Sequence, residues 1–278
     1  MKIQNAAEPG LEIYHKFIFT GSAGSGKSKL ITTLPGRTFV WVFDPSALSA
    51  YQGCNWIDYS SYRLDLLDLT PYSLAKEVNK GVRKIGNPNP PSAYLDFAKD
   101  FNEAWNSGFY DAYDNVVLDS GTSFQDAGMD AVLYNNKRFG KVPWQDDYPA
   151  EMALSLRNYR SLTNLPKNVV LILHDNLKED KLSGKVFFQT TLTGLNRAKV
   201  PNLFNHLLRC TSEHSKHART GKTEARYLIQ TTPDRFCPGV RTAFRGLEPL
   251  HDVTIPQDQF HVAQKYGLGK IIEDQKAL

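Results

Sequence analysis

The sequence predicts an α/β protein with a mainly parallel sheet flanked by helices and an antiparallel β-hairpin late in the chain. A glycine-rich loop, GSAGSGKS at residues 21–28, lies between a strand-like run and a helix-like run. Apolar runs that end in a polar residue, such as FVWVFD and NVVLDS, alternate with helical patterns, which favours parallel strands covered on both faces. A chain of 278 residues with 41% hydrophobic content is long enough for one large core.

A βαβ unit is predicted at the N-terminal end. Residues 11–20 have the composition of a core strand, residues 27–34 that of a short helix stopped by a Pro-Gly pair, and residues 38–44 that of a buried strand. Residues 1–10 are polar and are expected to form a flexible N-terminal arm.

The middle of the chain continues the alternation of helices and strands. Helical patterns are followed by apolar runs that end in a carboxylate or a histidine, the order expected of right-handed crossovers. The predicted helices are residues 66–86, 92–108, 124–137 and 151–165, and the predicted strands are residues 115–120 and 168–175.

The last third of the chain changes in character. Residues 204–214 and 225–232 read as the two strands of the late hairpin, and the chain ends in a short helical tail. We therefore expect a core domain at residues 11–250 and a C-terminal tail at residues 251–278.

Composition favours a soluble cytoplasmic protein without a membrane partner. The three cysteines, Cys54, Cys210 and Cys237, are far apart and odd in number, so neither a disulfide framework nor a C-x-x-C site is indicated. The first residues lack the pattern of a signal peptide, and no run reaches the ~18 apolar residues that span a bilayer. The net charge of +4 permits nucleic-acid binding without requiring it.

The loop at residues 21–28 matches G-x-x-x-x-G-K-[ST] at every fixed position. Its glycines allow backbone N–H groups to surround phosphates, Lys27 would reach the β and γ oxygens, and Ser28 would offer its hydroxyl to Mg²⁺. The alternative is a simple Gly/Ser-rich turn. The residues expected to bind nucleotide are Gly21, Ser22, Ala23, Gly24, Ser25, Gly26, Lys27, Ser28 and Lys29.

A P-loop needs a second contact to Mg²⁺, and a carboxylate at the end of a neighbouring strand usually supplies it. Asp119 in NVVLDS is the best candidate, although an aspartate that merely ends a strand is the alternative, and Asp44 after FVWVF is its rival. The N/T-K-x-D motif of guanine-specific proteins does not occur. We therefore expect ATP and Mg²⁺ as cofactors.

The segments GSAGSGKS, FVWVFD, NVVLDS, VVLILHD and YLIQTTPDR resemble, in this order, the RecA-type ATPase core. The resemblance covers residues 11–250 and is nearest to the short phage-encoded ATPases of the single-strand annealing and recombination class. It implies a RecA-like P-loop fold, binding to single-stranded DNA, assembly into a ring or filament, and cooperation with a single-strand DNA-binding protein.

The second strand departs from that family. Where the family has Asp-Thr-Glu, with a water-activating glutamate, this chain has Asp44-Pro45-Ser46. Asp44 is then the nearest carboxylate for the role of general base. The resemblance therefore implies slow Mg²⁺-dependent ATP hydrolysis, or ATP binding used as a switch.

Two further residues gain roles from the resemblance. His174 occupies the place of a polar sensor of the γ-phosphate, and a strand-end histidine paired with a carboxylate is the alternative. Arg235 resembles the arginine that oligomeric motors insert into a neighbouring subunit's site; the alternative is a solvated turn arginine.

Residues 176–199 occupy the place of the family's DNA-contacting loop. Basic side chains there would follow a phosphate backbone while an aromatic ring stacks on a base; an ordinary strand with a solvated basic face is the alternative. The candidates are Lys178, Lys181, Lys185, Phe187, Arg197 and Lys199. A second basic patch consists of Lys216, Arg219, Lys222 and Arg226. Zinc is disfavoured, because Cys210, His214 and His217 lack a fourth ligand and a known spacing.

Three functions follow from the sequence. The first is an ATP-switched protein that anneals or recombines phage DNA. The second is a non-catalytic helicase loader or interaction protein, which the missing glutamate favours. The third is a small-molecule or nucleotide kinase, in which the basic segment after His174 would form a lid.

Overall fold

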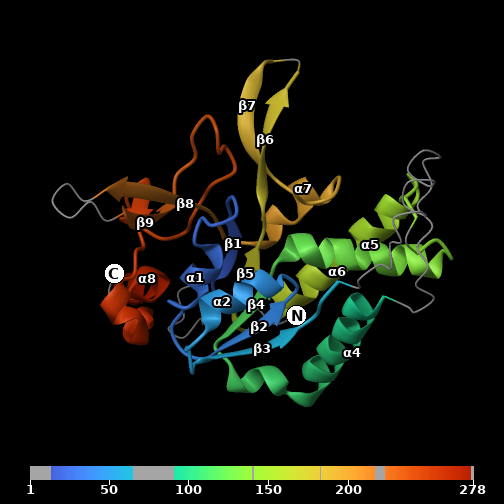
Figure 1. Ribbon diagram of the computed structural model, residues 1–278, viewed down its shortest axis with the longest axis horizontal. Coiled ribbons are helices and arrows are strands. Elements are labelled where there is room, and N and C mark those ends of the chain that lie inside the picture. The colour runs from blue at the N-terminus through green and yellow to red at the C-terminus, as the bar shows by residue number, and fades with distance from the viewer. Residues whose placement is uncertain (1–13, 65–90, 140, 182, 217–222, 277–278) are drawn as a thin grey trace, which may run out of the picture.

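The computed structural model describes residues 14–64, 91–139, 141–181, 183–216 and 223–276. Its centre is an eight-stranded sheet with the strand order β10-β9-β8-β1-β5-β4-β2-β3, and a separate two-stranded hairpin rises above it (Figure 1). The sheet strands are β1 (Lys16–Thr20), β2 (Thr38–Val42), β3 (Ile57–Ser61), β4 (Asn115–Asp119), β5 (Asn168–Ile172), β8 (His206–Lys216), β9 (Thr223–Gln230) and β10 (Leu250–Asp252).

The sheet is mostly parallel. Strand β1 pairs in parallel with both β5 and β8, β4 pairs in parallel with β5 and β2, and β2 pairs in parallel with β3. Strands β9 and β10 continue it in antiparallel fashion, so β8 and β9 form the late hairpin. The predicted α/β class, a mainly parallel sheet flanked by helices with a late antiparallel β-hairpin, is confirmed.

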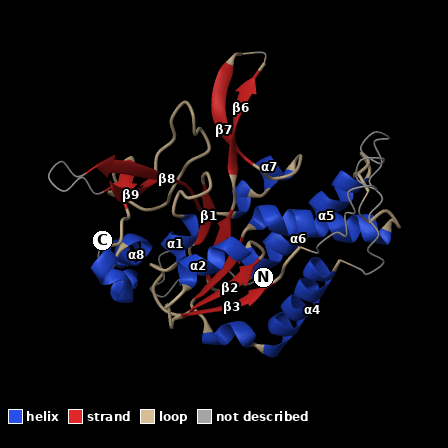
Figure 2. Ribbon diagram, viewed as in Figure 1, coloured by secondary structure: helices blue, strands red, loops and turns tan. Residues whose placement is uncertain are grey.

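Helices cover both faces of this sheet, as Figures 1 and 2 show. Helices α4, α5 and α6 lie on one face, and α1, α2 and α8 lie on the other. The helices are α1 (Lys27–Ile31), α2 (Leu48–Tyr51), α4 (Ser92–Ser107), α5 (Gly121–Asn135), α6 (Asp147–Asn164), α7 (Asn196–Lys199) and α8 (Gly267–Lys276), and the 3₁₀ helices are η1 (Pro45–Ala47), η2 (Phe109–Ala112), η3 (Pro201–Leu203) and η4 (Gln257–Lys265).

The core is divided by the sheet into two apolar layers. In β1, Ile18 packs with the layer under α4, α5 and α6, whereas Phe17 and Phe19 pack with the layer under α1 and α8. This alternation follows from the two-residue period of a strand. Because both faces are covered, the central strands β1, β2, β4 and β5 are mostly apolar, which explains why the sequence shows them so clearly.

Parallel pairing also brings the functional candidates to one edge of the sheet. Asp119 ends β4, Thr20 ends β1 just before the P-loop, and His174 follows β5 after a single residue. Since the carboxyl ends of parallel strands lie at the same edge, these side chains face a common crevice, where ligands of open α/β sheets bind.

Three features of the fold were not predicted from the sequence. Strand β3 lies between the predicted strand at residues 38–44 and the predicted helix at residues 66–86, α6 begins at Asp147 rather than at residue 151, and the basic segment contains a hairpin of β6 (Asp175–Asp180) and β7 (Lys185–Thr190). The polar compositions of β3 (IDYSS) and β6 (DNLKED) conceal these two strands. The predicted helix at residues 66–86 and the N-terminal arm lie outside the described residues.

The segment after β10 packs against the core. Leu268, Ile271 and Ile272 of α8 are buried in the layer that also contains α1, and the backbone N–H of Leu268 donates to Oγ1 of Thr33 at 3.0 Å. Each buried aliphatic side chain contributes about 1.5–3 kcal/mol. Among the helices of the described residues, none is both long and apolar enough to cross a bilayer.

Candidate nucleotide-binding site

The P-loop connects β1 to α1 through backbone conformations that require glycine at two points. Gly26 caps α1 with a φ of 86°, and a Cβ there would lie 2.5 Å from Cδ1 of Tyr227. Gly21 has a φ of 146°, and its Cβ would lie 2.5 Å from the carbonyl oxygen of Cys210. Both positions combine a left-handed backbone with a close neighbour, so the loop wraps tightly between β1, β8 and β9.

The side chain of Lys27 is buried and turned onto the loop itself. Its Nζ donates to the carbonyl oxygens of Gly21 at 2.8 Å and Ser22 at 2.7 Å. Burial lowers the pKa of this ammonium, and the nearby groups Cys210, Asp175, Asp119 and Asp44 partly counteract that effect. The cation is thus held at the centre of the loop, where phosphate oxygens would exchange for the carbonyls.

Ser28 and Asp119 meet directly, although 91 positions separate them in the chain. The Ser28 hydroxyl donates to Oδ2 of Asp119 at 2.8 Å, and the phenol of Tyr51 donates to the same oxygen at 2.6 Å. A P-loop hydroxyl beside a strand-end carboxylate is the pair that holds Mg²⁺ in P-loop proteins, and Mg²⁺ commonly uses few protein ligands. These residues therefore fit the ion.

Asp119 is almost completely buried, and that environment changes its acidity. Burial raises the pKa of this carboxyl to about 6, while the hydrogen bonds from Tyr51 and Ser28 act in the opposite direction. A buried carboxylate without a fixed cation beside it is costly. A divalent cation would supply that charge, which is a second reason to place Mg²⁺ between Ser28 and Asp119.

Asp44 lies at the mouth of the same cavity. Its Oδ1 accepts hydrogen bonds from the backbone N–H of Ser46 at 3.0 Å and from the Ser46 hydroxyl at 2.7 Å, so the carboxylate caps η1. A side-chain cap of this kind fixes the chain direction after β2. Ser46 therefore occupies the position of the family's glutamate while orienting the carboxylate two residues before it.

His174 is half-buried beside the P-loop lysine. Its backbone N–H donates to Oγ1 of Thr122 at 3.2 Å. Burial lowers the pKa of its imidazole, with a smaller contribution from the charge of Lys27, so the ring is neutral at neutral pH. A neutral imidazole can donate to or accept from a phosphate-bound group without adding a second cation.

These residues line one cavity of about 360 Å³ at the carboxyl edge of the sheet. The predicted residues from Ala23 to Lys29 line it together with Asp44, Asp119 and His174. Gly21 and Ser22 contribute through the carbonyls that bind Lys27. The sequence-based site is thus brought together in space, except for Arg235.

Two tyrosines of this site were not found from the sequence. Tyr51 of α2 reaches Asp119, and Tyr227 of β9 covers Gly26 and lies with its ring centre 5.3 Å from Nζ of Lys29. Neither belongs to a motif, because α2 and β9 approach the P-loop only in the folded chain. Tyr227 lines the cavity as a flat aromatic surface beside the phosphate loop.

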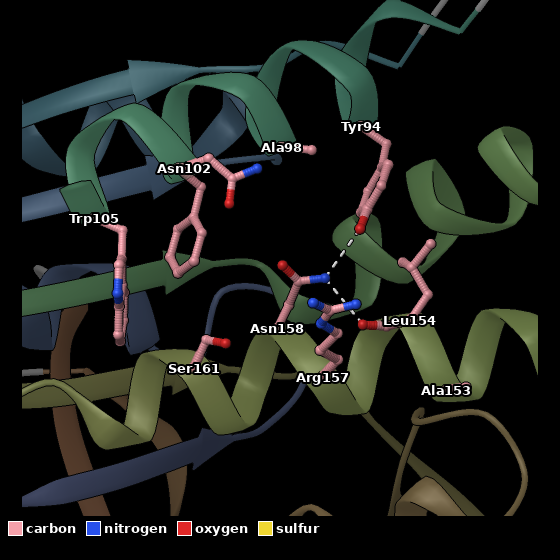
Figure 3. A pocket seen from close by; sticks show the side chains of 10 residues that line it. Tyr94, Ala98, Asn102, Trp105, Ala153, Leu154, Arg157, Asn158 and Ser161 are labelled. Atoms are coloured by element: carbon pink, nitrogen blue, oxygen red, sulfur yellow. Dashed lines mark hydrogen bonds between the residues drawn. The ribbon is translucent and has the colours of Figure 1, made fainter.

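A larger cavity of about 530 Å³ lies between α4 and α6 (Figure 3). Its polar groups include Asn158, which donates to the Tyr94 hydroxyl at 3.0 Å and to the Leu154 carbonyl at 2.9 Å. It shares no lining residue with the P-loop cavity. It is larger than the P-loop cavity, but the residues suited to phosphate and Mg²⁺ line the smaller one.

Arg235 does not line the P-loop cavity of its own chain. Its guanidinium is exposed and lies 4.4 Å from the ring centre of Phe236, whose carbonyl oxygen accepts from the backbone N–H of Phe188 in β7 at 2.7 Å. The loop that carries Arg235 therefore supports the foot of the β6–β7 hairpin. Its role in a neighbouring subunit stays a prediction.

The predicted DNA-binding residues lie on and below the β6–β7 hairpin. Lys178, Lys181 and Lys185 are exposed on it, and Phe187 is half-buried near its foot. Arg197 and Lys199 are exposed on α7, after the hairpin. The segment is therefore a hairpin and a short helix rather than an irregular loop, and its DNA contacts stay a prediction.

The other sequence candidates form no second site among the residues that the structure describes. Arg226 is exposed and pairs with Asp252 at 2.8 Å, while Arg219, Lys222 and His217 lie outside the described residues. Cys54, Cys210 and Cys237 are buried free thiols. Within the described part of the chain, no group of three His, Cys, Asp or Glu side chains is placed to hold a metal ion.

Three comparisons with known proteins were made, and one of them identifies a family. No curated protein sequence matches the chain. Among solved structures, the crystal structure of the KaiC-like protein PH0186 from the hyperthermophilic archaea Pyrococcus horikoshii OT3 is similar at 8% identity, covering 86% of this chain and 89% of that one with a TM-score of 0.36. A family model described as an AAA domain (AAA_24) matches residues 14–242. The chain therefore belongs to this AAA domain family and is a nucleotide-binding P-loop ATPase.

Proposed function

We propose that this protein is a Mg²⁺-dependent, ATP-switched protein that binds single-stranded DNA and promotes annealing or homologous recombination, as the phage-encoded ATPases that it resembles do. One observation carries the proposal. His174 lines the P-loop cavity, and the next residue, Asp175, begins β6 of the projecting hairpin. A displacement of His174 caused by the nucleotide would therefore be passed directly to β6, because no other residue lies between them in the chain.

The second strand of the hairpin, β7, is also connected to His174 at its C-terminal end. Both the backbone N–H and the hydroxyl of Thr191, directly after β7, donate to the carbonyl oxygen of His174, at 3.0 and 3.1 Å. The Thr191 hydroxyl also lies 2.8 Å from that of Thr122 in α5. His174 thus anchors both strands of the hairpin, which supports coupling between nucleotide and hairpin.

The hairpin presents charge and an aromatic ring on one face. Lys178 lies opposite Phe187 in the register, and Lys185 precedes Phe187 by two residues, so the three side chains share a face. Lysines on such a face would follow a phosphate backbone while a ring stacks on a base. Asp180 also lies on this face, so the charge there is not purely positive.

ATP and Mg²⁺ are assigned to the P-loop cavity. Ser28 and Asp119 would hold the ion, Lys27 would neutralise the β and γ oxygens, and Tyr227 would lie against the nucleotide. The ion supplies positive charge at the γ-phosphate, while Asp44 would accept the proton of an attacking water. A homo-oligomer, in which Arg235 reaches a neighbouring subunit, belongs to the same proposal.

The experiment measures ATP hydrolysis and binding to a fluorescent oligothymidine by the same preparation, at several salt concentrations. The wild type should bind the oligonucleotide more tightly with ATP. Lys27→Ala should abolish both turnover and the ATP effect, whereas Lys99→Ala on the surface of α4 should change neither. DNA binding that is indifferent to ATP would contradict the switch.

A paired variant tests the hairpin. Lys178→Ala combined with Lys185→Ala should weaken DNA binding and reduce the slope of log K against log salt by about 1.4, because each phosphate contact on single strands contributes about 0.7. The matched control, Lys99→Ala with Lys270→Ala, removes the same charge elsewhere and should leave the slope unchanged. Equal slopes in the two double variants would contradict a hairpin interface.

A non-catalytic switch is the second candidate, and one observation favours it. The carboxylate of Asp44 is engaged by Ser46, where the resembled family has its glutamate. Under this alternative, ATP binds and changes a partner surface, but turnover is undetectable with or without DNA. Phosphoryl transfer to a small acceptor, unaffected by DNA, would instead indicate the kinase reading.

A further inference from the structure

A second cavity lies at the foot of the β6–β7 hairpin, outside the P-loop site. Its volume is about 230 Å³, below the ~300–1,000 Å³ of pockets that hold drug-sized ligands. Its lining includes Phe187 and Phe188 of β7 together with Pro238 and Gly239. The space suits one planar ring system rather than a whole nucleoside triphosphate.

The aromatic surface of this cavity is only partly used by the protein. Phe188 is stacked by Arg209, whose guanidinium carbon lies 3.6 Å from the ring centre, and Arg209 is fixed by Asp175 at 2.8 Å. Within the described part of the chain, no ring or guanidinium stacks on Phe187. A half-buried aromatic side chain that lines a cavity without a stacking partner offers a platform for a planar ligand.

Three arginines line the cavity. Arg209 is paired with Asp175, whereas the other two are held by neutral acceptors that leave their charge uncompensated. Arg197 donates from Nε to the Leu192 carbonyl at 2.7 Å, and Arg241 donates to the Pro201 carbonyl at 2.6 Å. Across the described ranges, neither arginine forms an ion pair with a carboxylate. Oriented guanidinium groups of this kind are suited to phosphate oxygens.

From this arrangement we infer that the cavity binds one unpaired nucleobase, with Phe187 as the stacking surface and Arg197 and Arg241 as contacts for the flanking phosphates. The source of the base, a nucleotide splayed out of single-stranded DNA, follows from the proposed function, and this part of the inference rests on it. A free mononucleotide has the same chemistry and is the other source to be tested. Bases on single strands are commonly bound on aromatic or guanidinium planes.

The cavity can be filled from a position that tolerates a side chain. A Cβ on Gly239 would have a single neighbour within 4 Å, Cδ2 of Leu207 at 4.0 Å, and Leu207 also lines the cavity. Gly239→Leu should therefore occupy the space of the base, whereas Gly239→Ala makes the same backbone change and leaves most of the space free. Melting temperatures of both variants report whether the fold is intact.

The probe is an oligothymidine that contains one 2-aminopurine, measured with a non-hydrolysable ATP analogue in the P-loop. The wild type and Gly239→Ala should change the 2-aminopurine emission on binding. Gly239→Leu should bind without that change and about tenfold more weakly, as expected from the loss of one stacked base. Phe187→Ala should have the same effect as Gly239→Leu, and it tests the site without filling it.

The outcomes separate the cavity from the proposed function. If Gly239→Leu and Phe187→Ala bind the oligonucleotide as the wild type does, the cavity is not a base site although the DNA-binding function stands. If the wild type binds no oligonucleotide, the proposed function fails. Binding of dAMP is then measured with the non-hydrolysable ATP analogue in the P-loop. If the wild type binds dAMP and Gly239→Leu does not, the cavity is a site for a free nucleotide. If neither protein binds dAMP, or both bind it equally well, the inference is overturned.

Discussion

Tyr51 donates a hydrogen bond of 2.6 Å to Oδ2 of Asp119, the same carboxylate oxygen that accepts from the P-loop residue Ser28. The tyrosine is buried, and burial raises its own phenol pKa well above the usual range. It therefore remains a neutral donor at all working pH values. This contact makes α2, an element without a recognisable motif, part of the proposed metal site.

Tyr51→Phe should shift the pH dependence of Mg²⁺-dependent ATP turnover. The hydrogen bond from Tyr51 lowers the pKa of Asp119, which burial raises to about 6. Loss of a hydrogen bond to a charged group, about 1.5–3 kcal/mol, should raise that pKa by about one unit or more. Since the metal needs the ionised carboxylate, turnover should fall at a higher pH than in the wild type.

The control for this variant is Tyr62→Phe. Tyr62 donates to Asp100 at 2.7 Å, a tyrosine–aspartate pair that does not line the P-loop cavity. Its removal should leave the acidic limb of the pH profile in place. An unchanged profile in Tyr51→Phe would contradict the role of Tyr51 in setting the acidity of Asp119.

Asp44→Asn should reduce ATP turnover by about 10²–10⁴-fold if Asp44 is the general base. Asparagine caps a helix about as well as aspartate does, so the η1 cap formed with Ser46 should survive and the melting temperature should hardly change. Asp44→Ala removes both functions and should in addition cost about 0.5–2 kcal/mol of stability. Wild-type turnover in Asp44→Asn would assign the proton transfer to another group.

Gly26→Ala should weaken nucleotide binding through two effects that can be separated. The φ of 86° is unfavourable for alanine, and the new Cβ would lie 2.5 Å from Cδ1 of Tyr227. Gly53→Ala is the matched control, because Gly53 has a φ of 83° and open space around its Cβ. The control should show only the backbone cost of about 1–2 kcal/mol in urea unfolding.

In the double variant Gly26→Ala, Tyr227→Ala, the steric part of the effect should disappear and the backbone part should remain. Calorimetric titration with an ATP analogue measures both. Since Tyr227 would also lie against the nucleotide, Tyr227→Ala alone is the reference for the double variant. If Gly26→Ala lowers the affinity as much in the Tyr227→Ala background as in the wild type, Tyr227 does not constrain the loop.

His206 should make the fold sensitive to mild acid. Its ring is completely buried between His15, at 3.1 Å, and Thr242, at 2.8 Å, and burial lowers its pKa to about 3, with a contribution from His15. Below pH ~6.5 the unfolded chain takes up a proton that the native state refuses. Stability should therefore fall by about 1.4 kcal/mol per pH unit from pH 6.5 downward, until the pH approaches 3.

Urea unfolding at pH 7, 6 and 5 tests this slope before most carboxylates titrate. His206→Gln should flatten it, although the variant will be less stable at pH 7. The exposed His214 provides the control, since His214→Gln should leave the slope as it is. A steep slope that persists in His206→Gln would assign the acid sensitivity to His15 or to the carboxylates.

The sequence by itself determined the sheet that carries the site. Strands β1, β2, β4 and β5 are mostly apolar because both of their faces are buried, and this makes them visible without any structure. The motif GSAGSGKS and the position of Asp119 at a strand end were sufficient to predict the pairing of Ser28 with Asp119, because parallel strands bring their carboxyl ends to one edge.

Only the tertiary structure decided which other side chains complete that edge. Tyr51 and Tyr227 come from elements whose approach to the P-loop depends on packing of the whole chain, and no local pattern encodes it. The β6–β7 hairpin is hidden for a different reason: its strands project from the body, so they bury too little apolar surface to show the alternation that marks a strand. Sequence therefore reveals what is buried on repeating faces, whereas contacts between distant single residues appear only in the folded molecule.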